Sequence, residues 1–342
     1  MRTAVIGFGL AGRVFHAPLI HAVDGLDVAV VVTTSDERAA QARAAYPDVA
    51  VVGTAEEAFE RCDLVVVATP NRSHAPLALA AIERGLPVVV DKPFAASSQE
   101  AERVLAAGGR VTVFQNRRWD GDFLSARRLV ETGELGDVVR FSSRFERFRA
   151  DVKAGWRELG DPAEAGGQLL DLGAHLVDQA MVLLGPPVRV YAEVAARRPA
   201  AEVDDDAFVA LEHASGAVSH LAMGAVAHPF APRLTVQGLD GAFAVSRLDP
   251  QEPQLGAGIL PGDERYGLRS DPGRLVARDG SERDVEVARG RYQDFYAGVR
   301  AWLTDGAEPP VDPRDSLAGL RVLEAARRSA ATHAVIDLKD VV

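Results

Sequence analysis

The sequence predicts two domains, an N-terminal α/β domain with a doubly wound parallel sheet and a C-terminal α+β domain with an open, mostly antiparallel sheet. Three observations carry this prediction. A chain of 342 residues is long for one compact domain. Its first third alternates short β-branched runs with Ala-rich helical stretches, which is typical of a parallel sheet covered on both faces. After about residue 120 the pattern changes to long alternating strands, so we expect domains at 1–119 and 120–342.

In the N-terminal domain, apolar runs predict strands and the segments between them predict helices. Several helical segments have Ser, Thr or Asn near the start, where the side chain can cap a helix by accepting a hydrogen bond from its first turn. The expected strands are 3–6, 27–33, 64–68, 87–90 and 111–114, and the expected helices are 12–23, 36–45, 55–60, 74–85 and 98–107.

The C-terminal domain has the alternation of apolar and polar residues that is typical of antiparallel strands with one covered face. The segment 249–273 is rich in Pro and Gly and predicts irregular surface structure. The expected strands are 137–149, 188–197, 206–213, 216–226, 233–238 and 242–247, with short pieces around 274–288, and the expected helices lie near 121–132, 166–184, 291–304 and 314–331.

Composition and charge argue against several classes of protein. With 47% hydrophobic and 25% charged residues the chain should fold, and its formal charge of −11 would repel nucleic acid. No apolar run approaches the roughly 18 residues needed to cross a bilayer, and the N-terminus does not resemble a signal peptide. The single cysteine, Cys62, agrees with a reducing compartment. We expect a cytoplasmic protein that binds neither nucleic acid nor membrane.

The first predicted strand runs into the sequence GFGLAG, which fits GxGxxG and opens a helical pattern. In this context the first glycine allows a tight turn and the second lets a pyrophosphate approach the backbone. The third glycine lets helix and strand pack while the helix N-terminus faces the phosphates. The domain is therefore predicted to be a Rossmann domain that binds a dinucleotide through Gly7, Phe8, Gly9, Leu10, Ala11 and Gly12.

The end of the second strand bears on the choice between NADP and NAD. A carboxylate there accepts hydrogen bonds from both ribose hydroxyls of NAD and repels a 2′-phosphate. The chain has Thr34 and Ser35 at this point, with Arg38 one helical turn away, where it can pair with a phosphate. The expected cofactor is NADP(H). Asp36 leaves NAD(H) open, because a shift of one or two residues would put it on the ribose.

Two further strand ends carry polar groups to the edge where open α/β sheets bind ligands. A lysine between an apolar strand and a proline indicates a function for Lys92, because burying an unpaired lysine is costly; a surface lysine is the alternative. For His74 a ribose-facing, a helix-capping and a structural role are all open. Cofactor contacts are expected from Thr69, Pro70, Asn71, His74, Asp91, Lys92 and Asn116.

Together these motifs resemble the glucose-fructose oxidoreductase/inositol dehydrogenase/MocA-type family. The resemblance spans nearly the whole chain and includes ATPN before His74, DKP at 91–93 and GGQLLDLGAH at 166–175. FHAPLI at 15–20 and QNRRWD at 115–120 are similar to the scyllo-inositol dehydrogenase-like branch, in which NADP(H) use is common. Many relatives have Glu in place of Asp91, although this branch often carries the same Asp.

The resemblance implies a catalytic set of Lys92, Asp171 and His175. Asp171 and His175 are four residues apart, so on a helix they share one face. Oxidation of a secondary alcohol needs a base for the hydroxyl proton and a donor for the developing alkoxide. Either His175 or Lys92 can carry the proton, and Asp171 can orient them. Two such ligands with no third nearby indicate no metal site.

The substrate pocket is expected to lie in the cleft between the domains, with a loop at 162–167 as a lid. Its lining is predicted to include Lys92, Asp171 and His175, together with Trp119, Trp156, Arg157 and Tyr292, for each of which a packing or surface role is the alternative. The expected function is NADP(H)-dependent hydride transfer on a cyclic polyol or sugar such as inositol. A sugar-modifying enzyme with transient redox and tightly bound NAD(P), and a non-catalytic NAD(P) sensor, are the alternatives. Relatives imply a homodimer or homotetramer.

Overall fold

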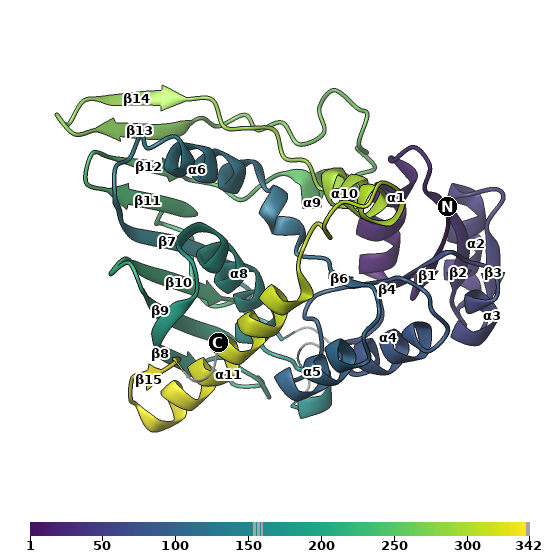
Figure 1. Cartoon of the computed structure of the whole chain (residues 1–342). Helices are drawn as coiled ribbons and strands as arrows, with labels where there is room; N and C mark the ends of the chain where they lie inside the picture. Colours follow the sequence, from purple (N-terminus) through teal and green to yellow (C-terminus); the bar gives the residue numbers. More distant parts are fainter. Residues whose placement is uncertain (153–154, 156–157, 159, 340–342) are drawn as a thin grey trace. The chain divides into compact units, whose positions relative to one another are not determined.

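The chain divides into two compact units in the computed structural model, which describes residues 1–152, 155, 158 and 160–339 (Figure 1). The first unit comprises Met1–Asn116, Gln251–Gly267 and Arg291–Leu317, and the second comprises Arg117–Pro250, Leu268–Gly290 and Ala318–Val342. The boundary expected after residue 119 falls three residues beyond the first break, at Asn116. Two later segments return to complete the first unit.

The first unit contains a parallel sheet, which confirms the predicted doubly wound fold. Within the described residues its strand order is β3-β2-β1-β4-β5-β6, and every neighbouring pair is parallel. In this order the topological switch point lies between β1 and β4, where such sheets bind ligands. The strands are β1 Arg2–Ile6, β2 Asp27–Val32, β3 Ala50–Val52, β4 Leu64–Val67, β5 Val88–Val90 and β6 Val111–Val113.

Three helices of this unit begin with a capping residue, as the Ser and Thr near their starts predicted. Ser35, Thr54 and Ser97 each accept a hydrogen bond from a backbone N–H in the first turn of the helix that follows. The segments are the π-helical turn η1 Ala11–His16, α1 Ala17–His21, α2 Asp36–Ala45, α3 Ala55–Phe59, η2 Asn71–Ser73, α4 His74–Ile82, α5 Ser98–Ala106, α9 Gln251–Gly256 and α10 Gln293–Thr304; the 3-10 turn η3 Asn116–Trp119 begins at the last residue of the unit's first segment. The short helix α9 lies within the segment that we expected to be irregular.

Aromatic packing joins the returning segment 291–317 to the core of the first unit. Phe295 and Tyr296 of α10 are fully buried, and the Phe295 ring packs edge-on against Phe114 with centroids 5.0 Å apart. The hydroxyl of Thr112, in β6, donates to the carbonyl of Val311 over 2.8 Å. These contacts explain why a segment nearly 200 residues away in sequence belongs to the Rossmann unit.

The second unit is built on a mixed sheet with the order β14-β13-β12-β11-β7-β10-β9-β8-β15 in the described part of the chain. Only β7 and β10 pair in parallel among these strands; the other pairs are antiparallel, as expected. Alternation gives no strand direction, so the parallel pair was not predicted. The strands are β7 Val138–Glu146, β8 Pro187–Ala195, β9 Asp206–His213, β10 Val218–Gly224, β11 Leu234–Gly238, β12 Gly241–Val245, β13 Gly273–Ala277, β14 Glu282–Val285 and β15 Ile336–Asp337.

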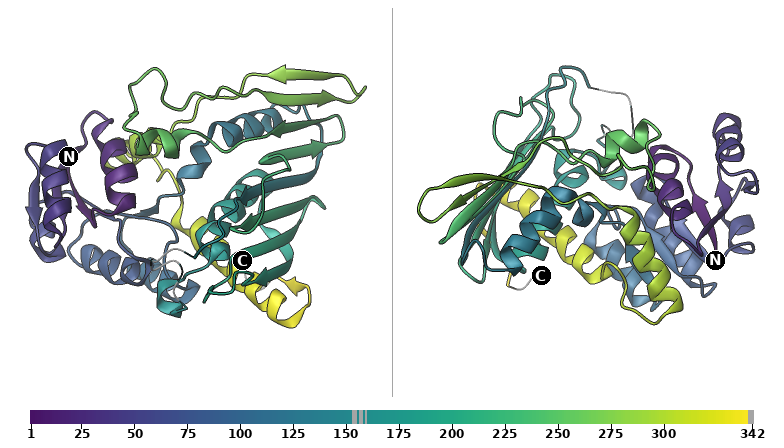
Figure 2. Two further views of the ribbon diagram at one scale, coloured as in Figure 1. Left: turned by 180° about the vertical axis from the view of Figure 1, so that it is seen from behind. Right: turned by 90° about the horizontal axis from the view of Figure 1, so that it is seen from above.

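Helices cover one face of this sheet, which Figure 2 shows edge-on. Strand β9 alternates buried and half-buried residues, with Ala207, Val209 and Leu211 on the covered face. Helix α6 packs on β11, and α8 packs on β7 and β10. The helical segments are α6 Gly121–Glu131, the 3-10 turn η5 Pro162–Glu164, α7 Gln168–Asp171, α8 Gly173–Leu184 and α11 Pro313–Thr332.

Candidate active site

The glycine-rich loop after β1 has the geometry that a dinucleotide requires. Gly7 has φ +93°, and a Cβ there would lie 2.6 Å from the carbonyl oxygen of Ala68. A Cβ on Gly12 would lie 2.0 Å from the Gly7 carbonyl oxygen, whereas a Cβ on Gly9 would meet nothing within 4 Å. Backbone contacts within the protein thus require glycine at the first and third positions. The second glycine leaves an open surface that a pyrophosphate fits.

A cavity of about 220 Å³ lies beside this loop and is lined by two arginine side chains. Arg38, a predicted cofactor contact, lines this cavity, and so does Arg13, which the sequence analysis missed. Arg13 directly follows the last glycine of the motif, a position that could have drawn attention to it. Ser35 caps α2, because its hydroxyl accepts from the Arg38 N–H, and Thr34 is exposed. The other lining residues are Phe8, Gly9, Leu10, Glu37 and Gln41.

His74 joins the loops that follow β4 and β5. Its buried ring lies between two backbone carbonyl oxygens, with Nδ1 2.8 Å from that of Pro93 and Nε2 3.0 Å from that of Thr69. Burial lowers the pKa of His74, and the charge of Asp91 opposes this shift. The geometry gives His74 a structural role at the carboxyl edge of the sheet.

Asp91 and Lys92 follow β5 at this edge. The Asp91 Oδ1 accepts from the Lys92 backbone N–H over 2.8 Å and lies 3.7 Å from His16 Nε2. Burial alone would raise the pKa of Asp91, but His16, His74 and Lys92 together lower it. The Asp91 carboxylate is therefore ionised at neutral pH, directly before the half-buried Lys92.

In the second unit, Asp171 ends α7 and His175 lies in the first turn of α8. The single helix expected near 166–184 is two helices joined at Leu172, whose φ of −98° and ψ of −35° remain helical. Asp171 and His175 therefore stay about one turn apart. His175 is only 5% exposed, and its ring meets the Phe145 ring edge-on with centroids 6.3 Å apart.

Asp204 holds the start of α7. Its Oδ2 accepts from the Leu169 N–H over 2.7 Å, and its carbonyl accepts from the Gln168 N–H over 2.9 Å. Gly167 allows this approach, because a Cβ there would lie 2.1 Å from Asp204 Oδ1. Burial raises the pKa of Asp204. Sequence reasoning missed Asp204 because 35 residues separate it from the Leu169 N–H that it caps.

An ion pair and close packing hold α8. The guanidinium of Arg118 donates two hydrogen bonds of 2.8 and 2.7 Å to Asp178, one turn after His175. A Cβ on Gly173 would lie 3.0 Å from Leu323 and 3.1 Å from the sulfur of Met223, so the helix packs closely against its neighbours. The backbone that carries His175 is thereby fixed on two sides.

Buried charges surround Phe145, the ring that meets His175. The guanidinium carbons of Arg117 and Arg233 lie 4.7 and 4.2 Å from its centroid. Arg233 lies 3.9 Å from Asp120 and 3.8 Å from Asp122, and both carboxylates are fully buried. Burial raises the pKa of Asp120 well above its usual value, nearby carboxylates add to the shift, and the two arginines oppose it. This cluster keeps the Phe145 ring in place.

Other predicted site residues lie in varied surroundings. Asn71 and Asn116 are buried, and Trp119 is half-buried at the end of η3. Tyr292, predicted to bind substrate, is instead fully buried in the first unit beside the ring of Phe15, where it fills the core. Trp156 and Arg157 lie outside the described residues.

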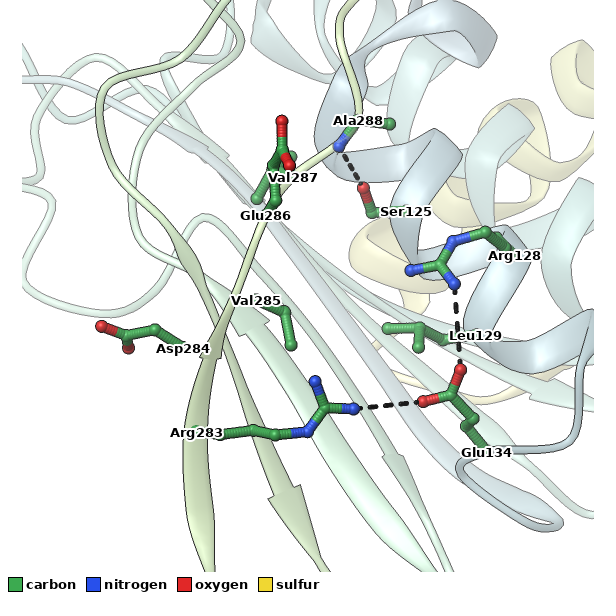
Figure 3. A pocket seen from close by; sticks show the side chains of 10 residues that line it. All are labelled: Ser125, Arg128, Leu129, Glu134, Arg283, Asp284, Val285, Glu286, Val287 and Ala288. Carbon is green, nitrogen blue, oxygen red and sulfur yellow. Dashed lines mark hydrogen bonds and ion pairs between the residues drawn. The ribbon is translucent and has the colours of Figure 1, made fainter.

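A larger cavity of about 500 Å³ in the second unit contains none of the predicted site residues (Figure 3). It lies between α6 and β14, where Arg128 and Arg283 both pair with Glu134 at 3.8 and 3.5 Å. Ser125 accepts a hydrogen bond of 2.7 Å from the Ala288 N–H. These pairs connect the segment around β14 to α6, so the paired groups already serve the fold.

Neither a metal cluster nor a membrane-spanning helix occurs among the described residues. No group of three or more His, Cys, Asp or Glu side chains there could hold a metal ion. Equally, none of the helices described is both long and apolar enough to cross a bilayer.

Family models match both parts of the chain. Residues 1–113 match the oxidoreductase family, NAD-binding Rossmann fold, and residues 127–338 match the oxidoreductase family, C-terminal alpha/beta domain. The chain belongs to the glucose-fructose oxidoreductase/inositol dehydrogenase/MocA family. It is therefore an oxidoreductase with an NAD(P)-binding Rossmann domain, as the sequence predicted.

Similar proteins extend over the full length of the chain. Uncharacterized oxidoreductase YdgJ of Escherichia coli is 38% identical, over 99% of both chains. The scyllo-inositol 2-dehydrogenase (NADP(+)) IolW of Bacillus subtilis is 32% identical over 99% of this chain and 96% of its own. A crystal structure of an oxidoreductase from Klebsiella pneumoniae has a TM-score of 0.91 and 38% identity, and covers 99% of this chain and 96% of its own.

Gly167→Ala should loosen the start of α7. The new Cβ would lie 2.1 Å from Asp204 Oδ1 at a φ of +97°, so we expect chemical denaturation to show a loss of about 2–3 kcal/mol of unfolding free energy. Gly216→Ala is the matched control, because Gly216 has φ +84° but open space at its Cβ, and should lose only about 1 kcal/mol. Equal losses in the two variants would show that the Asp204 contact is unimportant.

Proposed function

We propose that the protein is an NADP(H)-dependent dehydrogenase that acts on a secondary alcohol or ketone of a cyclic polyol or sugar, with an inositol as the leading substrate. The observation that carries the proposal is Lys92 beside the ionised Asp91 at the carboxyl edge of a Rossmann sheet. The likeness to the scyllo-inositol 2-dehydrogenase of Bacillus subtilis supports the substrate class and the choice of NADP.

In this proposal Lys92, Asp171 and His175 act on one substrate. The nicotinamide, when bound, accepts or supplies the hydride. Lys92 donates a hydrogen bond to the reacting oxygen and stabilises negative charge on it, and Asp171 accepts a hydrogen bond from a substrate hydroxyl. In the direction of oxidation, the hydroxyl proton passes to His175 or to neutral Lys92 as the carbinol hydrogen leaves as hydride, which yields a ketone. In reduction the same group returns the proton.

For the cofactor, we propose that Arg13 joins Arg38 in binding the 2′-phosphate of NADP. Two guanidinium groups in one small cavity favour a dianionic group, and arginine is suited to phosphate. Glu37 lines the same cavity and accepts a hydrogen bond from Gln41. Its carboxylate, rather than that of Asp36, is the group that could accept from the ribose of NAD. The backbone of the glycine loop, from Gly7 to Gly12, would cradle the pyrophosphate.

Arg13→Ala and Arg38→Ala should each lower kcat/KM for NADP about 10- to 100-fold, because each removes a charge-assisted hydrogen bond worth about 1.5–3 kcal/mol. The same variants should change kcat/KM for NAD by less than about threefold. Steady-state kinetics with both cofactors give the ratio. Arg43→Ala, an exposed change on the same helix, is the control. Equal effects on NADP and NAD would contradict phosphate recognition.

Lys92→Met should abolish turnover while cofactor binding persists. We expect absorbance of NADPH to appear when the wild-type protein meets NADP and one member of a panel of inositols, sugars and sugar acids. In Lys92→Met kcat should fall at least about 100-fold, and Lys339→Met, an exposed lysine, should behave as wild type.

The same assay distinguishes the alternatives. A burst of cofactor reduction without net accumulation would indicate a sugar-modifying enzyme with transient redox. Tight binding of NADP without turnover of any polyol would contradict the enzymatic proposal and favour a sensor.

We also propose a cytoplasmic homodimer or homotetramer that associates through the uncovered face of the sheet. Phe208 and His220 lie on that face with ring centroids 5.9 Å apart, half-buried in the single chain. Light scattering should give two or four times the mass of one chain. A monomer at micromolar concentration would contradict this assignment.

A further inference from the structure

Three polar side chains lie in a row inside the aromatic core of the first unit. The Tyr296 hydroxyl is 2.6 Å from His16 Nδ1, and His16 Nε2 lies 3.7 Å from Asp91 Oδ1. His16 and Tyr296 are fully buried, and the ring of Phe114 lies 4.4 Å from that of His16. Burying a polar group without full hydrogen bonding is costly. An apolar side chain at position 16 would avoid this cost, so the row requires an explanation.

The two ends of the row fix the position of the proton on His16. Burial and the charge of Asp91 raise the pKa of Tyr296 well above its usual value, so its hydroxyl stays protonated and donates to Nδ1. A neutral imidazole that accepts at Nδ1 carries its hydrogen on Nε2. That N–H faces the Asp91 carboxylate. The separation of 3.7 Å is too long for a direct hydrogen bond, so the Nε2–H acts on the carboxylate through the dipole of the N–H bond.

The Asp91 carboxylate faces the His16 imidazole and also contacts the backbone of Lys92. The same Oδ1 accepts from the Lys92 backbone N–H, and the charged and titratable groups that act on the carboxylate are His16, His74, Lys92 and Tyr296. His74 meanwhile lies 2.8 Å from the Pro93 carbonyl oxygen. Lys92 is therefore flanked by two residues that are each held by a buried histidine.

We propose that His16 is a positioning residue, held at Nδ1 by Tyr296, that keeps the Asp91 carboxylate ionised and oriented and so fixes the segment that presents Lys92. It touches none of the reacting atoms in this scheme. The inference about catalysis rests on the proposed function of Lys92, whereas the coupling of His16 to Asp91 is a property of the free protein.

The coupling is measured by NMR on the full chain without substrate. The Asp91 carboxyl carbon, assigned by comparison with Asp91→Asn, should titrate below its ordinary value of about 3.9. In His16→Leu the imidazole no longer offsets the effect of burial on the Asp91 carboxylate, so the titration midpoint of Asp91 should rise by about one pH unit or more. Tyr296→Phe removes one hydroxyl and should raise the Asp91 midpoint by less. In the same variant the ¹⁵N shifts of His16 should report a smaller share of the Nε2–H form. This variant serves if His16→Leu does not fold.

His213→Leu is the matched control. This histidine is buried in the second unit, 2.8 Å from both the Gly185 carbonyl oxygen and the Ser219 hydroxyl. Its loss should leave the Asp91 midpoint unchanged. An Asp91 midpoint within about 0.3 pH unit of wild type in both His16→Leu and Tyr296→Phe would overturn the proposal. The expected shift of one pH unit corresponds to a coupling of about 1.4 kcal/mol between His16 and Asp91.

Activity adds a second readout. The ionised Asp91 carboxylate contributes to activity at pH values above the pKa of Asp91, and this contribution is lost as the pH falls through that pKa. In His16→Leu the acid limb of kcat/KM should therefore move to higher pH by the same shift that the Asp91 midpoint shows in NMR. Coupling without turnover of any polyol by the wild type would contradict the proposed function alone. Turnover with an uncoupled Asp91 would contradict this inference alone.

Discussion

Two buried imidazoles fix the short segment that carries Lys92, and the proposed chemistry depends on that constraint. His16 faces the Asp91 carboxylate and His74 lies against the Pro93 carbonyl oxygen, so Lys92 is anchored at both neighbours. The segment follows a fully buried strand of the parallel sheet. A lysine on a flexible loop would lose side-chain and backbone freedom on binding substrate; a lysine anchored in this way has lost much of it on folding.

The second unit holds Asp171 and His175, the side chains proposed to act on the substrate, through groups that are also distant in sequence. Asp204 caps the helix that ends at Asp171, and Arg118 holds the helix of His175 through a two-hydrogen-bond pair with Asp178. In both units buried polar groups hold the backbone in position rather than bind the ligand. Their desolvation is costly, which favours the view that they serve function as well as folding.

Local patterns in the sequence predicted most of the fold but few of these anchors. β-branched runs and alternation found the long strands, because period and burial are local properties; the three-residue edge strand at 50–52 was too short to show a period. Motifs in the sequence led to the proposal of Lys92, Asp171 and His175 as site residues. The His16 contact with Tyr296 spans 280 residues, and no local pattern encodes such a pairing. Tyrosine is a residue type that often binds ligands, so the sequence alone could not distinguish Tyr292 from a binding residue. Its full burial makes that distinction.

The most direct measurement is a crystal structure of the protein with NADP and a cyclic polyol that it turns over. In that structure the Lys92 ammonium, the Asp171 carboxylate and the His175 ring should all lie within about 3.2 Å of hydroxyl groups on one polyol. The reacting carbon should face the nicotinamide, and Arg13 and Arg38 should contact the 2′-phosphate. A bound polyol that none of the three side chains reaches would contradict the account.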